Sequence, residues 1–151
     1  MRSQLEYAST VWSPWQNVLI NNIEKIQWGA ARYVVNDYNP YSSVTNHLID
    51  LNWEPLEARR IKSRLCMFYK MIQNYITIPF NLYIQLSSSK NTRQSNNYKF
   101  LQIPCRKNSY QQSFFPNTIP YWNNLPLSII DAHPLDQFKS LLNQLNYVTY
   151  A

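Results

Sequence analysis

The sequence predicts a mainly α-helical protein with one small β-hairpin, an α+β fold in which a helical layer precedes the hairpin and a closing helix. Apolar residues recur with the period of an α-helix in two long stretches, 16–35 and 55–72. Two short aromatic and aliphatic runs flank a polar turn between residues 98 and 116, which is the pattern of a hairpin. With 151 residues, 45% of them hydrophobic, the chain is long enough to bury the core of one domain.

The first two helices are expected at 2–12 and 16–35. The first is short and ends before Ser13 and Pro14. Gly29, the one glycine of the sequence, lies inside the second and should cost about 1 kcal/mol relative to alanine. Trp28 lies opposite the apolar stripe of this helix, and we expect a second element to pack on it. The stripe consists of Leu19, Ile23, Ile26, Ala30 and Val34.

A turn at 37–43 leads into a short helix that ends near residue 51, for which Ser42 or Ser43 can act as the N-cap. The next helix begins near Pro55, because proline is well suited to the first turn. Its expected buried stripe is Ala58, Ile61, Leu65, Phe68 and Ile72. Its basic side chains are expected on the solvent side: Arg59, Arg60 and Lys70 opposite the stripe, with Lys62 and Arg64 at its flanks.

The second half of the chain is more polar. A Ser- and Asn-rich loop is expected at 81–97, followed by the hairpin, a brief helical turn between prolines, and an amphipathic helix that begins at Pro134. The apolar side of that helix is Leu135, Phe138, Leu141, Leu142 and Leu145. The predicted organisation is a helical segment at 1–80, the loop at 81–97, and the hairpin with the closing helix at 98–151, packed together as one domain.

The positive charge of the chain is concentrated in one block. The net charge is +6, yet residues 59–107 hold ten basic and no acidic side chains. A block of one sign attracts phosphate and releases counterions when it binds nucleic acid. The candidate nucleic-acid-binding residues are therefore Arg59, Arg60, Lys62, Arg64, Lys70, Lys90, Arg93, Lys99, Arg106 and Lys107. A purely solvated helix face remains the alternative for the first four, which we call the basic cluster.

The sequence offers no catalytic or metal site. No acidic residues form the paired carboxylates of a polymerase or a two-metal nuclease, and a single glycine excludes a phosphate-binding loop. His47, His133, Cys66 and Cys105 do not have the spacing of metal ligands. Charges interrupt every apolar run before about 18 residues, so no membrane span is expected. The N-terminus is unlike a signal peptide, which favours an intracellular location.

Five segments carry a family resemblance: RSQLEYASTVWSPW, NNIEKIQWGAARYV, SSVTNHLIDLNWEPLEARRIKSRLCMFYKM, SFFPNTIPYWNNLP and LDQFKSLL, in this order. They resemble the segment C-terminal to the polymerase domain in reverse transcriptases of non-LTR retrotransposons, of the jockey-like LINE type. The resemblance covers residues 2 to about 145. Its most specific motifs are LEYA with WSP, LNWEPL and SFFP.

The resemblance implies an RNA-directed DNA polymerase with an endonuclease domain, acting in the nucleus on a transposable element. The palm, with its catalytic aspartates and Mg²⁺, would lie upstream, so this chain would be a truncated fragment with no catalysis and no cofactor of its own. It would correspond to the helical thumb and the C-terminal extension, with the missing polymerase domain as its neighbour. Its implied partner is RNA or an RNA–DNA hybrid, bound by the phosphate backbone.

Two functions remain open at this point: a nucleic-acid-binding fragment, and a structural or protein-interaction remnant. Trp28 and Gly29 stand where members of the family generally carry two basic residues, which weakens that surface as a phosphate contact. A third possibility is that the piece does not fold stably alone, because an apolar surface would face the missing neighbour, formed by Leu5, Tyr7, Val11 and Trp12.

Overall fold

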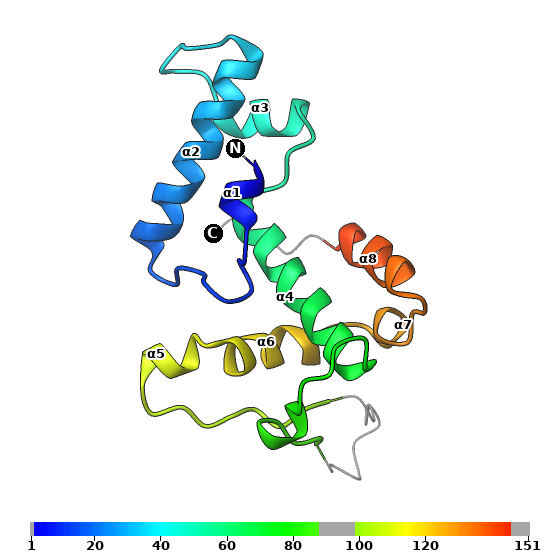
Figure 1. Ribbon diagram of the computed structural model, residues 1–151. Coiled ribbons are helices and arrows are strands. Elements are labelled where there is room, and N and C mark those ends of the chain that lie inside the picture. The colour runs from blue at the N-terminus through cyan, green and yellow to red at the C-terminus, as the bar shows by residue number, and fades with distance from the viewer. Residues whose placement is uncertain (1, 88–98, 146–151) are drawn as a thin grey trace. The chain divides into compact units, whose positions relative to one another are not determined.

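The computed structural model describes residues 2–87 and 99–145, and within these ranges the chain is mainly helical (Figure 1). The main part of the predicted fold class is confirmed. None of the described helices has the length and hydropathy needed to cross a bilayer. These helices are α1 (Arg2–Glu6), α2 (Asn17–Val35), α3 (Val44–Asp50), α4 (Leu56–Ile72), the 3-10 helix η1 (Phe80–Leu82), α5 (Asn108–Gln111), α6 (Phe114–Asn123), α7 (Leu127–Ile130) and α8 (Leu135–Gln144).

The chain forms two compact units, and the division falls inside α4, after Arg60. The first unit contains α1 to α3 and the start of α4. The second contains the rest of α4 and the described residues up to 145. The predicted loop at 81–97 lies largely outside the described residues. The predicted grouping of 1–80, 81–97 and 98–151 into one domain stays a prediction.

In the first unit, α2 packs against α3, but it buries a different face from its apolar stripe. The buried residues of α2 are Glu24, Gln27 and Ala31, whereas Leu19, Ile26 and Val34 of the stripe are exposed. Polar groups at the start of α4 select this face. Gln27 Nε2 donates to the carbonyl oxygen of Glu54 at 3.0 Å, and Glu24 Oε1 accepts the N–H of Glu57 at 3.0 Å. Trp28 is half-buried.

Glu24 thereby acts as a cap for α4 that is supplied by another helix. The first N–H groups of an α-helix have no partner within the helix and carry its positive dipole end. A carboxylate from α2 satisfies one of them, where a cap from the preceding residues is the usual arrangement. The expected cap of α3 differs as well: Ser43 is at the N-cap position without a side-chain capping bond, and Ser42 Oγ instead donates to Asn39 O at 2.8 Å.

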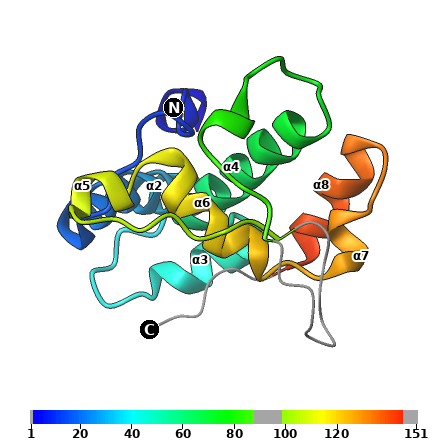
Figure 2. The ribbon, with the colours of Figure 1, turned by 90° about the horizontal axis from the view of Figure 1, so that it is seen from below.

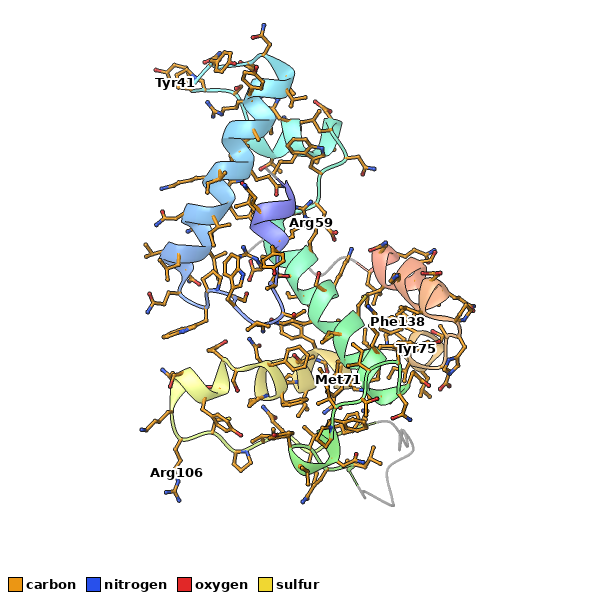
Figure 3. All side chains as sticks on the ribbon, in the orientation of Figure 1. Tyr41, Arg59, Met71, Tyr75, Arg106 and Phe138 are labelled. Atoms are coloured by element: carbon orange, nitrogen blue, oxygen red, sulfur yellow. The ribbon has the colours of Figure 1, made fainter. Side chains whose placement is uncertain are left out.

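In the second unit, the later turns of α4 lie among aromatic rings. Phe68 is in edge contact with Phe100 and Trp122, at centroid distances of 5.3 and 5.0 Å. Tyr69 stacks on Phe138 of α8 at 4.2 Å, and Figure 3 shows Phe138 beside this end of α4. Phe68, Tyr69 and Phe138 have no exposed surface. This packing confirms the burial of Phe68 in the predicted stripe of α4 and of Phe138 in the closing helix.

The predicted hairpin between residues 98 and 116 is wrong over the described residues. Its first run is extended, but its second run lies in α5 and α6. The antiparallel pairing that forms instead joins 85–87 to 99–101. The N–H of Ser87 donates to Lys99 O at 2.7 Å, and that of Leu101 donates to Gln85 O at 2.9 Å.

Prolines explain why the second run becomes a helix. Proline lacks the N–H that a strand ladder needs, but its fixed φ fits the first turn of a helix, which Pro116 occupies in α6. The side-chain amide of Asn123, at the end of α6, bonds to the backbone of Phe100 in place of a second hairpin strand. It accepts the N–H of Phe100 at 3.0 Å and donates to the Phe100 carbonyl at 2.8 Å. α6 is ten residues long, where only a brief turn was expected.

Candidate nucleic-acid interface

The basic cluster does not form the solvent face that the sequence predicts. Arg60, Lys62 and Arg64 are 4%, 7% and 8% exposed. The expectation fails because only Glu57 and Ser63 of the residues of α4 are exposed. The basic residues that alternate with the apolar stripe of α4 therefore do not mark a solvent-exposed face.

Arg59 and Arg60 connect the start of α4 to the N-terminal segment within the first unit. Arg59 Nη2 lies 2.7 Å from Glu6 Oε1 and donates to Gln27 Oε1 at 3.2 Å. In Figure 3, Arg59 extends from α4 towards α1. Arg60 Nη2 donates to the carbonyl oxygen of Leu5 at 3.3 Å, and its guanidinium carbon lies 5.1 Å from the ring centroid of Trp12. Both arginines are thus engaged by groups of the protein itself.

Burial shifts the titration of the charged groups around these arginines. Desolvation is the largest cause that raises the pKa of Glu24, and it is opposed by the N–H bonds at the start of α4 and by Arg60 and Arg59. Desolvation also lowers the pKa of Arg60, against the attraction of Glu24 and Glu6. The opposite charges compensate one another in part, as a structural ion cluster does.

The other candidate cations belong to the second unit and differ in exposure. Lys62 and Arg64 are buried, and both have interaction partners. Lys70 and Lys99 are half-buried. Arg106 and Lys107, just before α5, are exposed, and in Figure 3 Arg106 points away from α5 and α6. Lys90 and Arg93 lie outside the described residues.

The eight candidate residues in the described ranges are divided between the two compact units. Arg59 and Arg60 belong to the first unit and the other six to the second. Of the candidates in the described ranges, only Arg106 and Lys107 are exposed. The sequence alone does not distinguish the exposed cations from the buried ones. Segments that are distant in the sequence bury these side chains, and local periodicity does not reveal such contacts.

The two compact units differ in their balance of basic and acidic side chains. Residues 1–60 carry five basic and six acidic side chains, whereas residues 61–146 carry nine basic and two acidic ones. In the second unit the acidic residues are Asp131 and Asp136, and Asp136 is paired with Lys139 at 3.1 Å. Eight of the ten basic residues at 59–107 thus belong to the second unit.

The histidines do not form a catalytic relay or a metal centre in the described ranges. His47 Nε2 lies 3.1 Å from Asp37 Oδ2 and 3.3 Å from Ser42 Oγ, so both neighbours share one ring nitrogen, whereas a relay requires both nitrogens. The N–H of Asn39, and then Ser42, lower the pKa of Asp37. Within 2–87 and 99–145 there is no group of three metal-ligating side chains.

The fold and its charge define a small, mainly helical chain with one strongly basic unit. Comparisons with protein-family models, with curated proteins and with solved structures give no match for this chain.

Proposed function

We propose that the chain is a nucleic-acid-binding segment of a non-LTR retrotransposon reverse transcriptase and has no catalysis of its own. The observation that carries the binding role is the excess of nine basic over two acidic side chains in the second unit. Such a field attracts phosphate groups and favours binding by counterion release. The assignment to this family rests on the sequence motifs LEYA, LNWEPL and SFFP.

The proposed contacts differ from those that the sequence favours. The exposed Arg106 and Lys107 are the primary phosphate contacts, supported by the half-buried Lys70 and Lys99. Arg59 and Arg60 are not part of the binding surface in this proposal, since their side chains already bind Glu6, Gln27 and Leu5, as described above. The ligand is RNA or an RNA–DNA hybrid, which proteins bind mainly through backbone and shape.

A second candidate function, protein interaction, is favoured by the first unit. Tyr7 and Val11 are 78% and 88% exposed, and Trp12, Trp15 and Val18 are exposed as well. Large apolar side chains at the surface in such number are typical of a docking surface. In the proposed family the polymerase domain would be the neighbour that covers them.

The test measures fluorescence anisotropy of a labelled RNA–DNA hybrid with the purified chain between about 50 and 200 mM salt. Binding should weaken with salt, by about 0.7–0.9 in log K per log salt for each phosphate neutralised. The double variant Arg106→Glu/Lys107→Glu should lower affinity about tenfold or more and flatten the salt dependence by about two phosphates.

A matched control makes the same change of charge in the first unit, as Lys25→Glu/Arg32→Glu. We expect the affinity of this variant to stay within about threefold of the parent. Its changed charges would act on the ligand only over a long range, where salt screens them. Equal losses in the two double variants would mean that only net charge matters. Absence of binding at the lowest salt would leave protein interaction as the better explanation.

A further inference from the structure

A groove of about 490 Å³ lies in the second unit between the extended segment 102–105 and helices α5 and α6. In Figure 1 and Figure 2 this segment runs alongside the two helices. The volume is within the range of pockets that hold small organic groups. The groove takes no part in the ion cluster of the first unit, and it lies wholly among described residues of one unit.

The groove contains a pair of amide side chains joined to each other. Asn117 Nδ2 donates to Gln112 Oε1 at 3.1 Å. An amide side chain has two donor hydrogens and one acceptor oxygen. After this bond, the Nε2 group of Gln112 and the Oδ1 atom of Asn117 remain, and neither makes another hydrogen bond to the described residues. If both amides were turned over, a donor and an acceptor would still remain. In either orientation the pair therefore keeps one amide NH₂ group and one amide oxygen for a ligand.

Flat and apolar groups complete the walls. Tyr121 is half-buried and contributes an aromatic ring, and Pro104, Pro116 and Pro120 contribute ring faces. Gln102 and Gln111 add two exposed amides at the rim. No carboxylate is among the described residues that line the groove. A groove with a mixed polar and apolar lining and a neutral donor and acceptor suits a planar heterocycle, and it has no carboxylate to attract a cationic ligand.

We propose that this groove binds one base of a single-stranded nucleic acid, with Tyr121 as the stacking surface and the Gln112–Asn117 pair bonded to the edge of the base. The proposal deepens the proposed nucleic-acid function and rests on it. All four bases carry a donor next to an acceptor on their pairing edge, so the groove accepts bases with little sequence preference. A base in a duplex has this edge occupied, which restricts the ligand to an unpaired stretch.

The charges next to the groove favour a nucleotide over a peptide. Arg106 and Lys107 follow directly on the lining residue Cys105, and both are exposed. In this proposal both contact the phosphate backbone near the inserted base, and Arg106 points away from α5 and α6. A peptide would gain nothing from these cations unless it were acidic. The same cations serve the backbone contact proposed above, so one surface combines stacking with phosphate binding.

The experiment compares two labelled DNA octamers by anisotropy with the full chain at low salt. One has normal bases of mixed sequence, and the other is abasic at every position and so has the same phosphates. We expect the octamer with bases to bind about tenfold more tightly, which is the scale of one or more stacked bases. Asn117→Leu and, separately, Gln111→Ala should reduce that advantage. Asn143→Leu, an exposed amide on α8, should leave it unchanged.

A second measurement locates the base without any variant. An octamer with one 4-thiothymidine is irradiated on the wild-type chain, and the crosslinked peptide should contain Tyr121 or residues 102–117. Equal binding of the two octamers, or a crosslink elsewhere, overturns the base site. Binding to the phosphate backbone would still stand in that case, and an extended peptide would become the alternative ligand of the groove. Failure of both octamers to bind also overturns the base site, whereas the proposed function is decided separately by the anisotropy measurement with the RNA–DNA hybrid.

Discussion

Nη2 of Arg59 in α4 lies 2.7 Å from Oε1 of Glu6 at the end of α1. The side chains are 13% and 31% exposed, so the pair is partly shielded from solvent. Arg59 is one of the residues that the sequence marks as a phosphate contact, and the structure uses it to hold the N-terminal helix within the first unit. The charge of this arginine is therefore already paired with a carboxylate of the protein itself.

The Arg59–Glu6 pair should contribute modestly to stability. We expect Glu6→Gln to lower the free energy of unfolding by about 1 kcal/mol, because the partly exposed pair is screened by water. The measurement is the urea midpoint at pH 7. Asp50→Asn, which removes an exposed carboxylate from the same unit, serves as the control and should change little. An equal effect of the two substitutions would contradict a specific pair.

Gly29→Ala should stabilise the protein. A Cβ at position 29 would meet no atom within 4 Å, so the substitution adds no clash. Alanine is favoured over glycine inside a helix by about 1 kcal/mol, which corresponds to a rise in Tm of about 3 °C for a chain of this size. Thermal unfolding followed by circular dichroism checks this. A lower Tm would mean that position 29 is packed more tightly than the open space that the structure shows there.

Two neighbouring asparagines provide a matched test of the pairing between α6 and the extended segment. Asn123→Ala removes both hydrogen bonds to the backbone of Phe100 and leaves a buried residue's N–H and carbonyl unsatisfied. The expected loss is about 2 kcal/mol in the free energy of unfolding. Asn124→Ala, at the exposed C-cap of α6, should be neutral within about 0.5 kcal/mol. Similar urea midpoints for the two variants would show that the Asn123 bonds contribute little.

Glu24 should make stability depend on pH. Burial raises its pKa above the usual 4.5, so the folded state binds this proton more tightly than the unfolded state. The stability that this proton gives to the folded state is then fully present below pH 4.5, and it is lost as the pH rises through the folded-state pKa of Glu24. Glu24→Gln, which keeps an acceptor for the N–H of Glu57, should be more stable than the parent at pH 7.

Urea unfolding at pH 7 and at pH 4.5 measures this difference. The advantage of Glu24→Gln should narrow at the lower pH, since the parent carboxyl then takes up its proton. A variant that is less stable than the parent at pH 7 would mean that the attraction of Arg59 and Arg60 outweighs the cost of burying the charge.

The long helices and part of the core follow from the sequence alone. The stretches predicted at 16–35 and 55–72 correspond to α2 (Asn17–Val35) and α4 (Leu56–Ile72), and Phe68 and Phe138 are buried as their spacing indicates. These features are local, since a helix brings together residues three and four positions apart. The concentration of positive charge between 59 and 107 is likewise a property of composition, which no folding can alter.

Only the tertiary structure decided which sides of the helices are covered and which cations remain exposed. Glu24 and Gln27 contact the start of α4 across 33 and 27 residues of sequence, and such bonds moved the buried face of α2 away from its apolar stripe. In the same way, Glu6 and Leu5 engaged Arg59 and Arg60. A buried polar group gains a partner only where the fold places one, so periodicity along the chain cannot show whether an arginine meets solvent, a phosphate or a carboxylate.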